Sequence, residues 1–314
     1  MTEPASDPPD ISVIVIIIDG TDALGNCLDA LSRQTGDMTL EVIVPHDQIS
    51  GDAATLAATF PKVRFLDLGT VKGAPLSEDP MGFYNACTIR RAAGIKAARG
   101  RLIGMLTDRG IPAPDWAENA LQLQRQHSAA AVGGCTDNGI DTIWHWAVHF
   151  YDFARYMPPQ PTTMTDHLSV TNVCYEASAL AGLGDLAKHR FRELAVHEAL
   201  AASGQKMILS DGILTTEYRP KIPTRDLAME WFTWGRKYSG FRVSEIPTRL
   251  RLARILATPI VPFVLWFRQL GIQREKKVHM DRFWRASPLL FLIVTMWALG
   301  ELTGYCLGPK KEVA

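Results

Sequence analysis

Apolar runs alternate with helical patterns along the first 110 residues. Residues 11–18 (ISVIVIII) form a nearly continuous β-branched run that stops at Asp19-Gly20, which is typical of a strand buried on both faces of a parallel sheet. Asp22 can then cap a helix whose apolar positions recur at helical spacing. The same patterns predict strands at 40–44, 63–66 and 101–106, and helices at 53–60 and 89–98.

This alternation predicts the fold class. Strands and helices that alternate at short intervals give an α/β fold with a right-handed, mostly parallel, Rossmann-like sheet flanked by helices. In such sheets ligands bind at the carboxyl ends of the strands. Further along, residues 129–134 resemble a strand, residues 143–156 form an aromatic stretch, and residues 185–203 predict another helix.

Two apolar segments, 255–267 and 289–299, close the chain. The first contains Pro259 and Pro262, and the second is followed by Gly300 and Glu301, so neither is a continuous apolar span of about 20 residues. Basic residues flank both. We therefore expect helices that lie in, or re-enter, the cytoplasmic leaflet of a membrane, with the basic residues on anionic head groups. The alternative is a pair of buried helices in a soluble protein.

Composition and charge narrow the class of protein. The 314 residues suffice for a sizeable core, which excludes a fibrous or disordered chain. Lys plus Arg and Asp plus Glu are both 33, which argues against a nucleic-acid binder with a uniformly basic surface. The balance is uneven, because residues 236–286 contain twelve basic and three acidic side chains. An acidic body is thus followed by a basic, apolar tail.

The five cysteines show neither a disulfide framework nor a zinc-ribbon spacing. They are odd in number, widely spaced and without a CxxC pair, so we expect reduced thiols in a cytosolic compartment. Residues 1–10 are acidic and proline-rich, and they lack the basic start and apolar run of a secretory signal.

Several segments occur in a recognisable order. The strand ISVIVIII and its helix LGNCLDALSRQ are followed by LEVIV with Asp47, and then by RRAAGIKAARGRLIGMLTDRGIPAPDW. This order resembles the inverting family 2 glycosyltransferases of the GT-A fold over about residues 11–242. The closing segment WALGELTGYCLGP resembles the tails of a membrane-associated bacterial subgroup.

The resemblance implies a domain organisation and several donor contacts. It implies a disordered N-terminus (1–10), a GT-A domain (11–245) and a basic, apolar, membrane-associated region (246–314). Asp47 matches the position that contacts the nucleobase, and Arg91 matches a basic residue near the diphosphate, although Ala92 replaces the Asn that usually follows it. Asn172 matches a region that contacts the donor sugar or the acceptor.

The metal motif of the family is altered in this chain. A nucleotide-sugar is anionic at its diphosphate, so its site needs a divalent cation or fixed positive charge. Where the family has two or three acidic residues, this chain has Thr107, Asp108 and Arg109. Asp108 is thus a candidate catalytic and donor-binding residue and the one candidate ligand for Mg²⁺ or Mn²⁺, while Arg109 can pair with phosphate directly. We expect a weakened or absent metal requirement.

A hydroxyl acceptor also needs a general base. The segment RELAVHEALAASGQK resembles the family helix that carries this base, and counting back from Gly204 places Glu193 at its position. The alternative for Glu193 is a structural role at a helix N-terminus. Trp234 and Arg236 stand where processive members carry Q-x-x-R-W, and they can line the donor or acceptor mouth or simply pack.

The leading hypothesis is an inverting glycosyltransferase on the cytoplasmic side of the inner (plasma) membrane. It would move one sugar from a nucleotide-sugar to a hydroxyl acceptor, lipid-linked or glycan, in cell-surface polysaccharide synthesis, with no nucleic-acid partner. The second hypothesis is a degenerate GT-A domain that binds nucleotide or a partner at the membrane without catalysis. A nucleotidyltransferase is disfavoured, because no glycine-rich phosphate loop follows the first strand.

Overall fold

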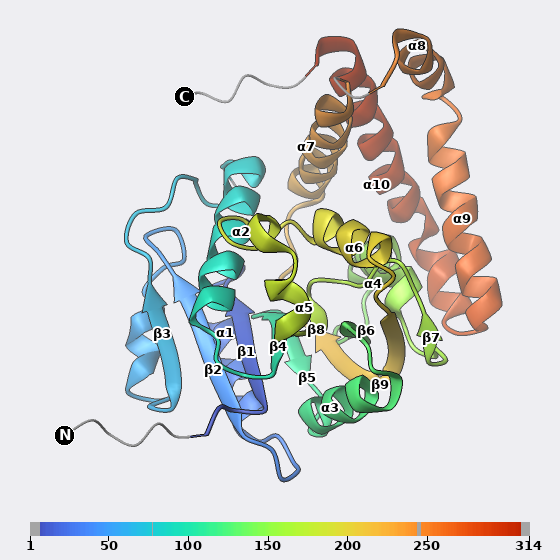
Figure 1. Cartoon of the computed structure of the whole chain (residues 1–314). Helices are drawn as coiled ribbons and strands as arrows, with labels where there is room; N and C mark the ends of the chain where they lie inside the picture. Colours follow the sequence, from blue (N-terminus) through green and yellow to red (C-terminus); the bar gives the residue numbers. More distant parts are fainter. Residues whose placement is uncertain (1–6, 77, 244–245, 309–314) are drawn as a thin grey trace. The chain divides into compact units, whose positions relative to one another are not determined.

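The computed structural model describes residues 7–76, 78–243 and 246–308, which form two compact units (Figure 1). The sheet unit comprises the residues up to 75, Gly82–Gly139 and Tyr156–Arg219. The helical unit comprises Leu76–Met81, Ile140–Arg155 and the residues from Pro220 onward. Residue 245, our expected domain boundary, and residues 1–6 of the expected disordered N-terminus lie outside the described residues.

The sheet unit is built on one mixed sheet. Among the described residues the strand order is β3-β2-β1-β4-β8-β6-β9-β5, with β7 paired to β9. The strands are β1 Ile11–Ile16, β2 Leu40–His46, β3 Val63–Asp67, β4 Leu102–Thr107, β5 Gly110–Pro112, β6 Ala131–Asn138, β7 Thr163–Met164, β8 Asn172–Glu176 and β9 Met207–Glu217. The first four are parallel, whereas β8 runs antiparallel to both β4 and β6. The α/β fold is confirmed, and the carboxyl ends of β1, β2 and β4 share one edge.

The helices of this unit differ from expectation at their ends. They are α1 Thr21–Ser32, α2 Pro80–Ala97, α3 Trp116–His127, α5 Ala177–Ala181 and α6 Glu193–Ala202, with 3₁₀ turns η1 Ala53–Ala57 and η3 Gly184–Leu186. The helix expected at 89–98 begins nine residues earlier, and the one expected at 53–60 is a 3₁₀ turn. The helix expected at 185–203 begins only at Glu193, because the buried Phe191 donates its N–H to the carbonyl of Thr88 and holds the preceding segment against α2.

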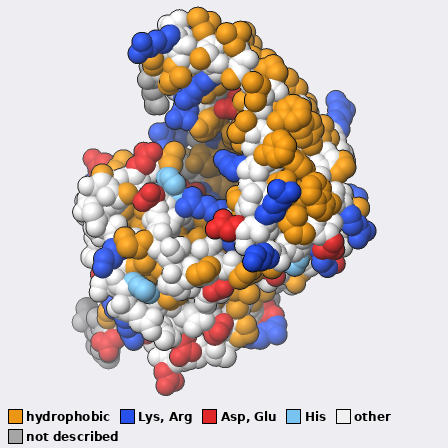
Figure 2. Space-filling model, turned by 90° about the vertical axis from the view of Figure 1, so that its right-hand side faces the viewer, with side chains coloured by type: hydrophobic (Ala, Val, Ile, Leu, Met, Phe, Trp, Pro, Cys, Tyr) orange, Lys and Arg blue, Asp and Glu red, His pale blue; other side chains and the backbone are white. Residues whose placement is uncertain are grey.

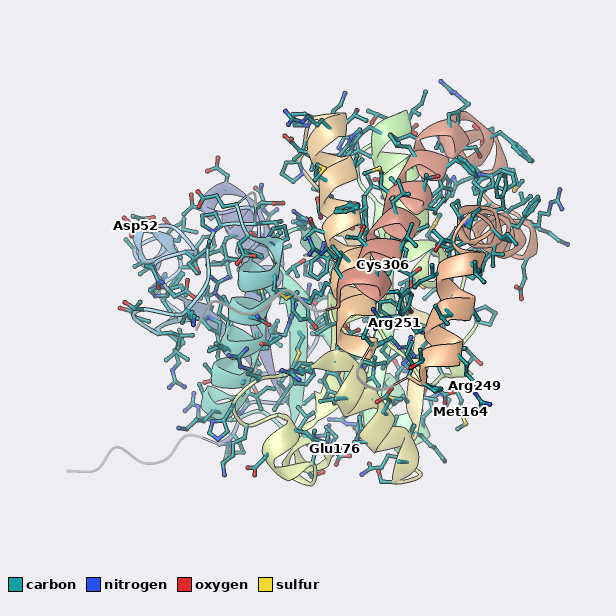
Figure 3. All side chains as sticks on the ribbon, turned by 90° about the horizontal axis from the view of Figure 1, so that it is seen from above. Asp52, Met164, Glu176, Arg249, Arg251 and Cys306 are labelled. Carbon is teal, nitrogen blue, oxygen red and sulfur yellow. The ribbon has the colours of Figure 1, made fainter. Side chains whose placement is uncertain are left out.

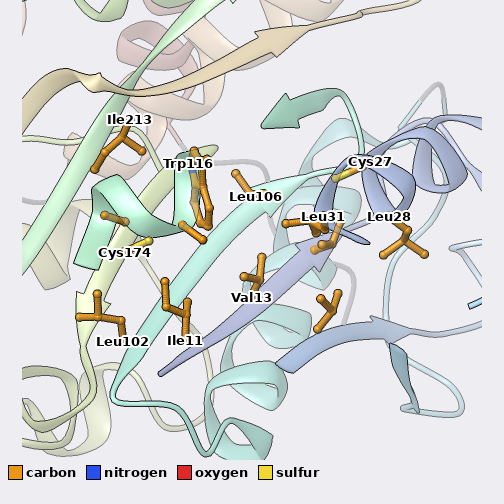
Figure 4. Packing of buried hydrophobic residues seen from close by; sticks show 14 of the residues in the cluster. Ile11, Val13, Cys27, Leu28, Leu31, Leu102, Leu106, Trp116, Cys174 and Ile213 are labelled. Carbon is orange, nitrogen blue, oxygen red and sulfur yellow. The ribbon is translucent and has the colours of Figure 1, made fainter. Parts of the chain in front are cut away.

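The core of the sheet unit lies between the sheet and helices α1 and α3 (Figure 4). Every residue of β1 is buried, as its continuous apolar run predicts. Trp116 of α3 is fully buried against the sheet, where Gly104 of β4 leaves room for its ring: a Cβ there would lie 2.9 Å from it. This packing fixes the strand ends that carry the candidate site.

The helical unit contains α4 Ile143–Phe153, η2 Ala154–Tyr156, α7 Thr224–Arg242, α8 Thr248–Ala257, α9 Val261–Lys276 and α10 Met280–Leu307. Helices α7 and α10 can approach closely because Gly235, Gly300 and Gly304 have no side chain. A Cβ at any of these three positions would clash with the opposite helix. Arg251 of α8 donates to the carbonyl of Cys306 near the end of α10, at 3.0 Å (Figure 3).

The two apolar segments of the tail lie within longer helices than expected. The segment at 255–267 is divided between α8 and α9. The segment at 289–299 is part of α10, whose 28 residues pass through Gly300 without a break. Of the described helices, α10 is long and apolar enough to cross a membrane, and α8 with α9 forms a pair bent by 75° that passes the same test together. The proline-containing break near Pro259 separates α8 from α9.

Candidate active site

Asp108 is the centre of the strand edge that we predicted to bind ligand. Its N–H donates to the carbonyl of Ile16 at 3.0 Å, which joins the end of β4 to the end of β1. Its Oδ2 accepts three successive backbone N–H groups, from Ile18 (2.9 Å), Asp19 (2.8 Å) and Gly20 (3.1 Å). Such a concave run of N–H groups holds an anionic oxygen in place. The other oxygen, Oδ1, is buried without a hydrogen-bond partner among the described residues.

Burial raises the pKa of Asp108 to about 6, because desolvation outweighs the hydrogen bonds from Asp19 and Ile18. The nearby carboxylate of Asp19 raises this pKa further, and the charge of Arg109 lowers it. At pH 7 the group is mostly ionised, and one of its oxygens is bare.

Arg109 is held in a fixed position by Asp19. Its Nε and Nη2 each donate to one oxygen of the Asp19 carboxylate at 2.7 Å, and both side chains are largely buried. Glu217, at the end of β9, lies close enough for its charge to interact with that of Arg109. The guanidinium is therefore oriented by a two-pronged ion pair, the geometry that arginine also offers to a phosphate.

These residues do not form a multi-carboxylate metal site. Within the described part of the chain, no group of three His, Cys, Asp or Glu side chains is arranged to hold a metal ion. A cation beside Asp108 would also lie near the charge of Arg109, which acts on the same carboxylate. Asp108 Oδ1 is the remaining candidate ligand.

Asp47, just after β2, forms a buried ion pair with Arg90 of α2. Arg90 Nε and Nη2 donate to Asp47 Oδ2 and Oδ1 at 2.8 and 2.7 Å, and both side chains have no exposed surface. Burial would raise the pKa of Asp47, but the hydrogen bonds and charge of Arg90 outweigh it and lower this pKa. Both oxygens of the Asp47 carboxylate therefore already accept hydrogen bonds from Arg90. The contact of Asp47 with a nucleobase stays a prediction.

Arg91, the next residue of α2, acts on Glu193 instead. Glu193 is the first residue of α6, and its Oε1 accepts the N–H of Val170 at 2.9 Å. Burial raises the pKa of Glu193 to about 7, against the charge of Arg91 and this hydrogen bond. Arg91 is itself buried, and its Nε has no partner among the described residues. A carboxylate with a pKa near 7 is suited to accept a proton at neutral pH.

Three residues near these groups were missed from the sequence. They are Arg90, which neutralises Asp47; Asp19, which orients Arg109; and Tyr84, whose pKa is raised by burial and also shifted by the charges of Arg91 and Glu193. The adjacent arginines at 90 and 91 were a usable signal, because two charges in a largely apolar helix need buried partners.

The other predicted site residues lie elsewhere. Asn172 of β8 is fully buried, where its Oδ1 accepts from Trp116 Nε1 at 2.8 Å and its Nδ2 donates to the carbonyl of Cys135 at 2.7 Å. Its amide is thus used within the core. Trp234 and Arg236 belong to α7 of the helical unit, with Lys237 Nζ 4.6 Å from the ring of Trp234. Their roles in donor binding stay predictions.

A cavity of about 630 Å³ adjoins Asp108 between α1 and β5. Its volume lies in the range of small-molecule sites, about 300–1,000 Å³. The lining residues are Ala23, Asn26, Asp29, Ala30, Arg33, Asp108, Ile111, Pro112, Pro114 and Tyr218. Asp108 is the predicted site residue that lines it, whereas Asp47, Arg91 and Glu193 do not.

Comparison with known proteins shows a glycosyltransferase-like fold. One similar solved structure is the mannosyltransferase PcManGT from Pyrobaculum calidifontis in complex with GDP-Man and Mn²⁺. The TM-score is 0.56 at 15% identity, over 95% of this chain and 88% of that chain. No family model and no curated protein matches the sequence.

Substitution of Arg90 by Met should destabilise the fold strongly, because it leaves the Asp47 carboxylate buried without a counter-charge. We expect a loss of about 3–5 kcal/mol in the free energy of unfolding by urea. Arg33→Met is the matched control, since Arg33 pairs with Asp29 on an exposed helix face and should cost about 0–1 kcal/mol. Equal losses for the two variants would contradict the role assigned to Arg90.

The titration of Glu193 can be measured directly. Carboxyl ¹³C NMR, assigned by difference from Glu193→Gln, should give a pKa of about 7. Arg91→Met should move this pKa upward, because removal of a nearby positive charge disfavours the ionised carboxylate. Arg192→Met, which changes an exposed arginine next in sequence, should leave it nearly unchanged. A pKa that is equal in wild type and Arg91→Met would show that Arg91 does not act on Glu193.

Proposed function

We propose that this protein transfers a single sugar from a nucleotide-sugar donor to a hydroxyl acceptor with inversion at the anomeric carbon. The observation that carries the proposal is the position of Glu193 at the first residue of α6, where its Oε1 accepts the N–H of Val170 at 2.9 Å and the charge of the buried Arg91 acts on its carboxylate. The fold likeness to a mannosyltransferase in complex with GDP-Man supports a nucleotide-sugar as the donor class. The order of segments that resembles family 2 supports the inverting mechanism.

In this proposal Glu193 acts as the general base. It accepts the proton of the acceptor hydroxyl while the hydroxyl oxygen attacks the anomeric carbon. The bond between that carbon and the diphosphate oxygen breaks, and the nucleoside diphosphate leaves with the bonding electron pair. Attack from the face opposite the leaving group inverts the configuration. Arg91 favours the ionised form of Glu193, because its charge lowers the pKa that burial raises.

The negative charge of the leaving diphosphate needs a fixed positive partner. We assign this role to Arg109, whose guanidinium is oriented by Asp19 and would have to be shared between Asp19 and the diphosphate. The mannosyltransferase of similar fold was solved with Mn²⁺, so a divalent cation held by Asp108 Oδ1 and the donor phosphates is also consistent with the residues present. A metal would there supply Lewis-acid stabilisation of the same charge.

We expect a weakened dependence on divalent cations, because Arg109 stands where a second carboxylate would bind the metal. Activity in EDTA should stay within about tenfold of that with Mn²⁺ or Mg²⁺, since one fixed charge remains in place. Loss of all activity in EDTA, followed by full recovery on addition of Mn²⁺, would contradict this expectation.

The acceptor and its location belong to the same proposal. A basic and apolar helical tail is consistent with a lipid-linked acceptor at the cytoplasmic face of the plasma membrane, in the synthesis of a cell-surface polysaccharide. A water-soluble glycan acceptor would not require the protein to bind a membrane, and the basic, apolar tail would then have no role in the reaction.

One observation favours a second candidate, a degenerate domain that binds without catalysis. Asp47 and Arg109 each form a two-pronged ion pair inside the protein, with Arg90 and Asp19 respectively. A donor would have to bind beside these pairs or displace them. The position of Glu193 at the start of α6, with the charge of Arg91 acting on it, favours catalysis.

Glu193→Gln tests the two candidates against each other. The amide has nearly the shape of the carboxylate but cannot accept the proton, so transfer should fall about 10²–10⁴-fold while the Kd for the donor stays unchanged. In wild type, kcat/KM should rise with pH up to about 7 and then level off, because the base must be ionised. The matched control is Glu198→Gln, which changes an exposed glutamate of the same helix. Equal transfer rates in the two variants would contradict the assignment of the base.

A further inference from the structure

Helix α9 exposes large apolar side chains although it buries two glutamines. Its buried residues are Pro262, Gln269, Leu270 and Gln273, and the two glutamines have 3% and 0% of their surface exposed. Phe263, Val264 and Phe267 are 53–59% exposed and recur at helical spacing on the outer face. A helix on the surface of a water-soluble protein has the opposite arrangement.

The apolar face continues across the bend into α8. Leu252, Leu256 and Ile260 are 55–79% exposed, and α8 buries none of its residues. We call this surface the elbow stripe, and it consists of Leu252, Leu256, Ile260, Phe263, Val264 and Phe267. Figure 2 shows hydrophobic side chains gathered on this face of the helical unit, with Lys and Arg side chains around them. A contiguous exposed apolar surface of this kind marks an interaction site.

The charges beside the elbow stripe are predominantly basic. The exposed basic side chains are Arg249 on α8, Arg268 and Arg274 on α9, Lys277 directly after α9 and Arg285 on α10, against the exposed acidic residues Glu275 and Asp281. A second copy of the chain is a poor partner, because a two-fold contact would bring equivalent basic groups toward one another. An anionic lipid surface instead offers hydrocarbon for the stripe and phosphate for the basic groups.

We propose that the elbow stripe is immersed in one leaflet of an anionic bilayer, with α8 and α9 lying in the interface. The bend of 75° between the two helices keeps them from forming one straight span. Helix α9 alone has 16 residues, or about 24 Å, against a hydrocarbon thickness of about 30 Å. The inference deepens the membrane location that belongs to the proposed function, but it does not depend on sugar transfer, because it concerns where the protein binds and not what it catalyses.

Flotation of the purified full-length protein with vesicles tests the proposal. After removal of detergent, the protein should float with phosphatidylcholine vesicles that contain phosphatidylglycerol, and binding should weaken as salt is raised. The double variant Phe263→Asp/Phe267→Asp should bind these vesicles at least about tenfold more weakly, since two aromatic side chains no longer enter the hydrocarbon. Its thermal midpoint should stay within a few degrees of that of wild type, because both side chains are more than half exposed and, among the described residues, their rings contact only Phe291 and Trp266.

Two further variants sharpen the result. Met164→Asp changes an exposed apolar residue of the sheet unit, 67% exposed, and should bind vesicles like wild type (Figure 3). Arg268→Glu/Arg274→Glu should lose binding to phosphatidylglycerol vesicles selectively. Vesicle binding by the Phe263→Asp/Phe267→Asp variant equal to wild type would overturn the proposal. A dimer without lipid that this variant dissociates, with no flotation of wild type, would identify the stripe as a contact between copies and overturn it as well.

Discussion

The candidate site depends on the hydrogen bonds that Asp108 accepts from the turn after β1. Three N–H groups bind one carboxylate oxygen, so the ends of β1 and β4 are fixed relative to each other. Because Asp19 lies in that turn, the same hydrogen bonds place its carboxylate against Arg109. A single acidic side chain thus positions the charged groups of the strand edge, and its second oxygen has no hydrogen-bond partner within the described part of the chain.

Two of the charge pairs in this region are direct ion pairs. Asp47 with Arg90 and Asp19 with Arg109 each form a two-pronged pair. Arg91 instead acts at longer range on Glu193, whose burial alone would favour the protonated form. This balance keeps a buried carboxylate near its midpoint at neutral pH, as expected of groups that exchange protons in catalysis. It is the physical basis for preferring an enzyme to a binding domain.

The sequence predicted β1 to β4 and β6, because a buried strand has a distinctive apolar run, and it missed β5, β7, β8 and β9. Asp47 and Asp108 were singled out by the resemblance to family 2, and both lie at the ends of predicted strands. The pairing of Arg90 with Asp47 could not be predicted, since it depends on the rotation of α2, which begins nine residues earlier than expected. The apolar positions of α9 were visible, but the sequence does not tell which face of a helix is covered.

The central claim is that the strand edge and Glu193 together transfer sugar. The most direct test is nucleotide release from UDP-, GDP- and dTDP-sugars by the purified full-length protein in detergent, with and without total lipid extract as acceptor. The account predicts release of one nucleotide, accelerated by the extract. Binding of a nucleotide-sugar without release from any donor, with or without the extract, would contradict it and identify a domain that binds without turnover.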